Sequence, residues 1–175
     1  MKKLRIATAW LDGCSGCHMS LLDLDDELLA IAEKAEFVYG PLVDASDPPE
    51  GIDVALVEGA VSSQDDLKKL RELRARARML VAFGDCAVTS NVSSMRNAIS
   101  PAALLQRVYV EGADTLPQVP SSGVPALLPQ ARPIHDFVAV DLYLPECQPP
   151  PRTILTAVIN LIEGRKSKSP PAKFG

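Results

Sequence analysis

The chain has 175 residues, of which 47% are hydrophobic and 23% charged, and these values are typical of a globular domain rather than a disordered segment. Its formal net charge of −4 argues against a nucleic-acid-binding protein, which would be basic. No stretch approaches the ~18 consecutive apolar residues of a membrane span, so we expect no direct membrane contact.

Short apolar runs alternate with helical patterns along the chain. The runs lack strict polar alternation, which is typical of strands buried on both faces of a parallel sheet. Strands are expected over residues 5–11, 36–39, 53–57, 78–83 and 137–144. Helices with one apolar face are expected over residues 19–34, 64–78 and 153–163. The pattern predicts an α/β fold, flavodoxin-like, with a five-stranded mostly parallel sheet in the order 2-1-3-4-5 and helices on both faces.

The domain organisation follows from the length and the prolines. Residues 1–164 are expected to form a single domain, because the chain has the size of one ordinary domain. Residues 111–135 contain several prolines and predict a long loop, which is uncommon unless the loop binds something. Residues 165–175 are basic, include two adjacent prolines, and predict a mobile tail.

Four cysteines carry the chemistry of the sequence: Cys14, Cys17, Cys86 and Cys147. Each follows the end of a predicted strand, so all four are expected at the sheet edge where open α/β folds bind ligands. The N-terminal residues have no long apolar segment and no twin arginine, so we expect a cytoplasmic protein whose cysteines stay reduced. Reduced cysteines on one edge, at predicted helix starts, suit the anionic core of a 4Fe–4S cluster.

Other interpretations of these cysteines remain open at this point. The Cys14–His18 segment has the C-x-x-C-H spacing of haem attachment, although exported proteins normally carry that motif. A thioredoxin-type dithiol would leave Cys86 and Cys147 without a role. Structural zinc usually uses two close cysteine pairs, and only one pair is present here. A flavin phosphate loop after the first strand would need more hydroxyls than Ser15 supplies.

The motifs around the cysteines resemble those of the small subunit of NiFe hydrogenases, in the short, soluble, NAD-reducing form. Cys14-Ser15-Gly16-Cys17 fits the family's C-x-G-C, and its continuation from His18 to Asp25 is similar to the NAD-linked subgroup. Residues 57–60 read V-E-G-A, residues 84–87 fit G-x-C-A, and residues 145–150, P-E-C-Q-P-P, are similar to P-G-C-P-P. These motifs occur in the family's order and run from the first predicted strand to the last cysteine.

The resemblance implies an electron-transfer subunit of a hydrogen:NAD oxidoreductase, with no catalytic centre on this chain. It implies that the four cysteines ligate one 4Fe–4S cluster. It also implies a large subunit with the NiFe centre as one partner. Iron–sulfur and flavin (diaphorase) subunits would carry further clusters, FMN and the NAD site. The alternative is a cluster-bearing connecting subunit of a membrane-linked hydrogenase or NADH:quinone oxidoreductase-like complex.

Some residues near these motifs depart from the family or have open roles. Glu146 replaces the family's glycine, Gln148 replaces a proline, and Gly13 stands where many hydrogenases have glutamate. Glu58 is interpreted as a residue that supports the cluster ligands, relays protons or lies at an interface, with a solvated loop carboxylate as the alternative. His18 is expected to contact a cluster sulfur or a partner, or else to lie on the surface. His135 is expected on the surface of the long loop, with a position facing a neighbouring electron carrier as the alternative.

Overall fold

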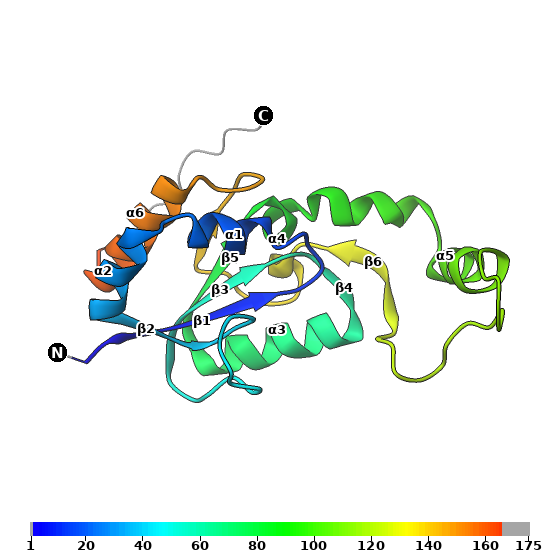
Figure 1. Ribbon diagram of the computed structural model, residues 1–175, viewed down its shortest axis with the longest axis horizontal. Helices are drawn as coiled ribbons and strands as arrows, with labels where there is room; N and C mark the ends of the chain where they lie inside the picture. The colour runs from blue at the N-terminus through cyan, green and yellow to red at the C-terminus, as the bar shows by residue number, and fades with distance from the viewer. Residues whose placement is uncertain (1, 166–175) are drawn as a thin grey trace.

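A computed structural model describes residues 2–165. Its main sheet has five strands in the order β2-β1-β3-β5-β7, and every neighbouring pair is parallel (Figure 1). The strands are β1 (Leu4–Trp10), β2 (Ala35–Tyr39), β3 (Ile52–Glu58), β5 (Ala77–Phe83) and β7 (Leu142–Leu144). The small strands β4 and β6 form a separate sheet, so β5 and β7 are the fourth and fifth strands of the main sheet. The strand order is therefore the predicted 2-1-3-4-5, and the predicted fold class is confirmed.

Helices cover both faces of the sheet (Figure 1). One face packs on α1 (Gly16–Leu22), α2 (Asp26–Lys34) and α6 (Pro151–Ile162). The other packs on α3 (Gln64–Arg76) and α4 (Asp85–Thr89). Successive residues of β3 serve opposite faces: Val54 and Leu56 join the first core, whereas Ala55 and Val57 join the second. Burial on both faces explains why the strands read as continuous apolar runs.

The predicted helix over residues 19–34 is wrong as a single element, because the chain turns between α1 and α2. Leu24 in this turn is 3% exposed and belongs to the core. Asp25 then adopts a φ of +47°, which a continuous right-handed helix does not permit. Leu24 therefore joins the core from the turn between the two helices.

The predicted fifth strand over residues 137–144 is also too long. A 3₁₀ turn, η3 (Ile134–Asp136), precedes it, and β7 begins only at Leu142. Just before β7, the Asp141 carboxylate accepts a hydrogen bond from the backbone N–H of Leu80 at 2.7 Å. It also binds the guanidinium of Arg74 at 2.6 Å. The Asp141 side chain thus binds a backbone N–H of β5, and the strand pairing between β5 and β7 begins only after Asp141.

Part of the predicted loop over residues 111–135 is regular structure. Strand β6 (Leu127–Arg132) pairs antiparallel with β4 (Val61–Ser63) in a separate two-stranded sheet. Residues 91–111, for which the sequence pattern predicted no element, form a 3₁₀ helix η1 (Asn91–Ala98), α5 (Pro101–Gln106) and a π-helical turn η2 (Arg107–Glu111). The predicted tail lies outside the described residues except for Arg165.

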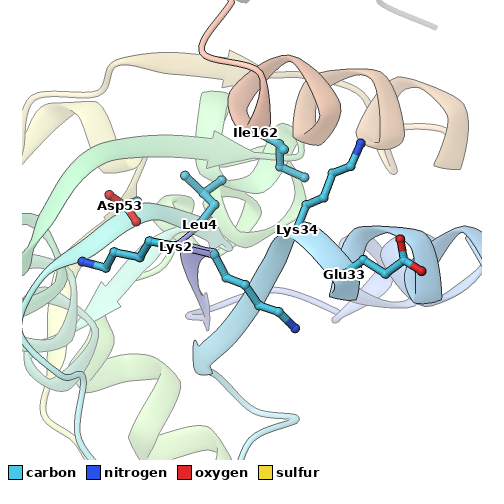
Figure 2. A pocket seen from close by; sticks show the side chains of 7 residues that line it. Lys2, Leu4, Glu33, Lys34, Asp53 and Ile162 are labelled. Atoms are coloured by element: carbon cyan, nitrogen blue, oxygen red, sulfur yellow. The ribbon is translucent and has the colours of Figure 1, made fainter.

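Within residues 2–165, no helix combines the length and apolar character that crossing a membrane requires. A cavity of about 470 Å³ opens at the edge where the strands begin (Figure 2). Its lining includes Leu4 at the start of β1, Asp53 in β3, and Glu33 and Lys34 at the end of α2. Because the strands are parallel, this cavity lies at the opposite edge of the sheet from the cysteines.

Candidate metal centre

The site begins where four neighbouring strands end in one row. Trp10 of β1 pairs with Glu58 of β3, Glu58 pairs with Phe83 of β5, and Phe83 pairs with Leu144 of β7. Three of these strands are each followed by a cysteine segment. Cys14 and Cys17 come after β1, Cys86 after β5 and Cys147 after β7. The register of the sheet therefore brings together segments that are far apart in the sequence.

The loop after β1 is fixed to the loop after β3 by backbone hydrogen bonds. The N–H of Asp12 donates to the Ala60 carbonyl at 3.1 Å, and the N–H of Ala60 donates back at 2.8 Å. Gly59 makes this approach possible, because it has a φ of +94° and a Cβ there would lie 2.9 Å from the Leu11 carbonyl carbon. The chain then turns at Ser15, with a φ of +64°, into the first turn of α1.

Glu58 is buried at the centre of this arrangement, with 1% of its surface exposed. Its carboxylate accepts hydrogen bonds from the backbone N–H groups of Cys17, at 3.3 Å, and His18, at 3.1 Å. It also lies 2.5 Å from Nδ1 of His18. A carboxylate at the end of β3 thereby holds the helix start that carries Cys17. The alternative of a solvated loop carboxylate is wrong.

His18 is buried as well, with 4% exposed, so the surface alternative for this residue is wrong. Its ring meets that of Phe83 edge-on, with centroids 6.1 Å apart. Its Nε2 is buried, and no atom of residues 2–165 hydrogen-bonds to it. The described contacts of His18 are with Glu58 and Phe83, inside this chain.

The segments of Cys86 and Cys147 are fastened to one another. The N–H of Gly84 donates to the Leu144 carbonyl at 2.8 Å, and the N–H of Asp85 donates to the Glu146 carbonyl at 3.1 Å. In return, the Asp85 carboxylate accepts from the N–H of Glu146 at 2.7 Å. Sequence reasoning missed Asp85 as part of the site and named Glu146 only as a departure from the family's motif. The replacement of a family glycine at position 146 was the available signal.

The first and last cysteine segments also touch. The Ser20 hydroxyl on α1 donates to the Pro149 carbonyl at 2.6 Å. A Cβ added to Gly16 would lie 2.5 Å from Oε1 of Gln148 and 3.2 Å from Sγ of Cys14. The hydrogen bond and these close approaches join all the cysteine-bearing segments in one site.

The sulfurs share an electrostatic environment. Burial is the largest cause that raises the pKa of the Cys17 thiol, followed by the charge of Glu58 and those of the other three cysteines. Burial, followed by the charges of Cys147 and Cys14, raises the pKa of Cys86 to about 11. These thiols hold their protons at neutral pH unless a cation takes their place. Cys17 and Cys86 are buried, whereas Cys14 and Cys147 are exposed.

The donor set and its surroundings fit an iron–sulfur cluster. Four cysteines are the usual ligands of a 4Fe–4S core, with one thiolate at each of four irons. Among residues 2–165, no three His, Cys, Asp or Glu side chains converge on the position of one metal ion. Gly84 leaves room beside Cys17, because a Cβ at that position would clash with its sulfur. The Cys17 sulfur thus lies directly against the backbone of Gly84.

Gly84→Ala should destabilise the chain and displace the Cys17 sulfur. Gly84 has a φ of +82°, and strain of this kind costs a residue with a Cβ about 1–3 kcal/mol before any clash is counted. Gly123→Ala is the matched control, because Gly123 has a φ of +76° and nothing lies within 4 Å of the position that a Cβ would take. Urea unfolding should show the larger loss for Gly84→Ala. Equal losses would contradict the close approach to Cys17.

The aromatic residues Trp10 and His135 both contact neighbouring groups of this chain. The Trp10 indole N–H donates to the Gly13 carbonyl at 2.9 Å, and the ring remains 45% exposed. His135 lies in η3, with 39% of its side chain exposed, and packs edge-on against Tyr143 at 5.9 Å. The predicted surface position of His135 agrees with this exposure.

The site and fold together define a class: an α/β subunit with four cysteines at the carboxyl edge of a parallel sheet. Residues 14–161 match the family described as NADH ubiquinone oxidoreductase, 20 kDa subunit. The chain belongs to this family, and the predicted resemblance to the small subunit of soluble NAD-reducing NiFe hydrogenases is confirmed.

Several known proteins are similar to this chain. The delta subunit of NAD-reducing hydrogenase HoxS from Cupriavidus necator is 32% identical over 168 residues, which cover 93% of this chain and 80% of the relative. One subunit of the F420-non-reducing hydrogenase vhu from Methanocaldococcus jannaschii is 37% identical over 169 residues, or 95% of this chain and 59% of the relative. The chain thus spans about three-fifths of that relative's length.

Solved structures agree with the fold. A chain of an NAD⁺-reducing [NiFe]-hydrogenase in the H₂-reduced state superposes with a TM-score of 0.91 and 41% identity, covering 97% of both chains. A chain of the [NiFeSe]-hydrogenase from Dm. baculatum superposes with a TM-score of 0.60 and 16% identity, covering 99% of this chain and 68% of the other. The second likeness concerns the fold alone.

Proposed function

We propose that this chain is the electron-transfer small subunit of a cytoplasmic NAD-reducing NiFe hydrogenase. In this proposal Cys14, Cys17, Cys86 and Cys147 hold one 4Fe–4S cluster. The observation that carries the proposal is the set of hydrogen bonds that fastens the cysteine segments at one sheet edge. Its 41% identity to a chain of an NAD⁺-reducing [NiFe]-hydrogenase supports the same role.

The residues of this chain have the role of holding the cluster in place. The thiols give up their protons to become ligands, which the raised pKa values of Cys17 and Cys86 make unfavourable without bound iron. Glu58 keeps the Cys17 segment in place through the amides whose hydrogen bonds it accepts. When bound, the cluster accepts and releases one electron at a time. No acid, base or nucleophile of this chain is assigned a catalytic role.

The exposure of the cysteines supports a role between partners. Cys17 and Cys86 face the protein interior, whereas Cys14 and Cys147 reach the surface. An electron carrier needs such a surface, because the next centre has to come close to it. The proposed partners are a large subunit with the NiFe centre and iron–sulfur/flavin diaphorase subunits. The latter would hold further clusters, FMN and the NAD site.

The test is an assay of the native complex purified through this chain. We expect the complex to reduce NAD⁺ with hydrogen in the absence of any membrane. The co-purifying chains should include a nickel-containing subunit and a flavin-containing one. The alternative is a connecting subunit of a membrane-linked hydrogenase or NADH:quinone oxidoreductase-like complex, and the matching family takes its description from an NADH ubiquinone oxidoreductase subunit. Activity that requires a quinone and fails with NAD⁺ would support that alternative and overturn the proposal.

A further inference from the structure

Residues 91–126 form an arm that belongs to neither core of the domain. The arm comprises η1, α5, η2 and the irregular segment after them, and the structure describes all of it. None of its residues is buried. In Figure 1, α5 lies beyond the ends of the strands and away from the main sheet. Helices in proteins gain most of their stability by packing an apolar face, and this chain provides little such packing for the arm.

Exposed apolar side chains are concentrated on the arm. Among residues 2–165, eight large apolar side chains are more than half exposed, and five of them lie here: Val92, Met95, Ile99, Val108 and Leu116. Only four of the arm's 36 residues are charged, two of each sign, whereas 23% of the whole chain is charged. Contiguous exposed apolar surface marks interaction sites, and the centres of protein–protein interfaces are depleted in charge. The arm therefore suits an apolar protein surface as its partner.

Hydrogen bonds fix the base of the arm beside the edge that carries the cysteines. Its first helix, η1, follows α4 directly. The Ser93 hydroxyl in η1 donates to the carbonyl of Asp12, two residues before Cys14, at 2.9 Å. The Asn97 amide exchanges two hydrogen bonds with the backbone of Ala131 in β6, both at 2.8 Å. The surface of the arm is thus continuous with the edge at which Cys14 is exposed.

We propose that the arm is a docking surface for the partner subunit that approaches the cysteine edge, and that this partner covers it with an apolar surface of its own. The inference rests on the proposed function, which requires a neighbouring redox centre to come close to Cys14 and Cys147. A partner at that edge meets the base of the arm, because Ser93 is bound to the loop of Cys14. Covering the arm removes its apolar side chains from water and supplies the packing that its helices need.

Hydrogen–deuterium exchange followed by mass spectrometry compares the arm in the isolated full chain and in the native complex. We expect the amides of residues 91–126 to exchange at least about tenfold more slowly in the complex, because the partner covers them there. An intact complex that reduces NAD⁺ and in which the arm exchanges as fast as in the isolated chain overturns the inference and leaves the proposed function intact. Slow exchange in an isolated chain that forms dimers would assign the arm to a second copy of this chain and also overturn the inference.

Two double variants test the side chains. Met95→Glu with Val108→Glu places charge on the arm, and Leu29→Glu with Leu42→Glu is the matched control on α2 and the segment after β2. All four side chains are more than half exposed, so neither pair should lower the urea midpoint of the isolated chain.

The partner chains that co-purify with each tagged variant are then quantified. We expect their recovery to fall at least about tenfold for the arm variant, because charge replaces apolar contacts at the centre of the interface, and to stay at the wild-type level for the control. Wild-type recovery with the arm variant, or equal losses for both pairs, overturns the inference. A wild-type chain that recovers no partner overturns the inference and the proposed function together.

Discussion

Replacing Cys17 by serine in the intact complex should abolish hydrogen-dependent NAD⁺ reduction. Cys17 is 7% exposed, and its segment is bound to Glu58 on β3. A serine hydroxyl is a poor substitute for a thiolate ligand of iron. Even the loss of a residue that only supports a ligand costs about 10–100-fold in metal affinity or activity. We therefore expect less than about a hundredth of the wild-type rate.

A second activity of the same complex serves as the control for Cys17→Ser. NADH oxidation by artificial acceptors takes place at the proposed flavin partner and does not pass through this chain. It should survive in Cys17→Ser, provided that size-exclusion chromatography shows an intact complex. Equal loss of both activities in an intact complex would contradict the proposed position of this chain between the hydrogen site and the flavin.

Glu58→Ala should produce the largest loss of stability at a residue that is not a proposed ligand. The change removes a buried carboxylate and leaves the N–H groups of Cys17 and His18 without their acceptor. It also leaves Nδ1 of His18 without its partner. Leaving a buried hydrogen-bonding group without its partner typically costs about 1–3 kcal/mol. We expect a loss in this range for the free energy of unfolding.

Urea unfolding of the full chain measures this loss, and Glu36→Ala is the matched control. Glu36 is a carboxylate on β2 that lies 3.6 Å from Arg5, with 52% of its side chain exposed. Exposed ion pairs of this kind contribute about 0–1 kcal/mol. Similar losses for the two variants would show that Glu58 does not hold the Cys17 segment.

The strands and their order could be predicted because each strand is marked by residues that are close together in the sequence. Each central strand is a short apolar run, and its burial on both faces needs no knowledge of distant residues. The small sheet was missed for the opposite reason. Strand β4 has three residues and β6 contains Pro129, a residue that central strands exclude. Their pairing joins segments more than sixty residues apart, which no local pattern reveals.

The grouping of the four cysteine segments at one sheet edge could be predicted, and Glu58 and His18 could be named as candidate supports, whereas the contacts that hold these residues could not. Parallel strands bring their carboxyl ends to one edge, so residues that follow those ends could be grouped from the sequence. The burial of Glu58 depends on His18, which lies forty residues earlier. The role of Asp85 depends on the backbone of Glu146, sixty-one residues later. Such contacts arise from the folded register and have no sequence pattern of their own.

The central claim is that four cysteines of this chain hold one 4Fe–4S cluster. Its most direct test is iron and acid-labile sulfide analysis of the full chain reconstituted without oxygen. We predict about four irons and four sulfides per chain. Cys86→Ser and Cys147→Ser should each lose or convert the cluster. Stoichiometric zinc or covalent haem in the native protein, or an unchanged iron content in both serine variants, would contradict the claim.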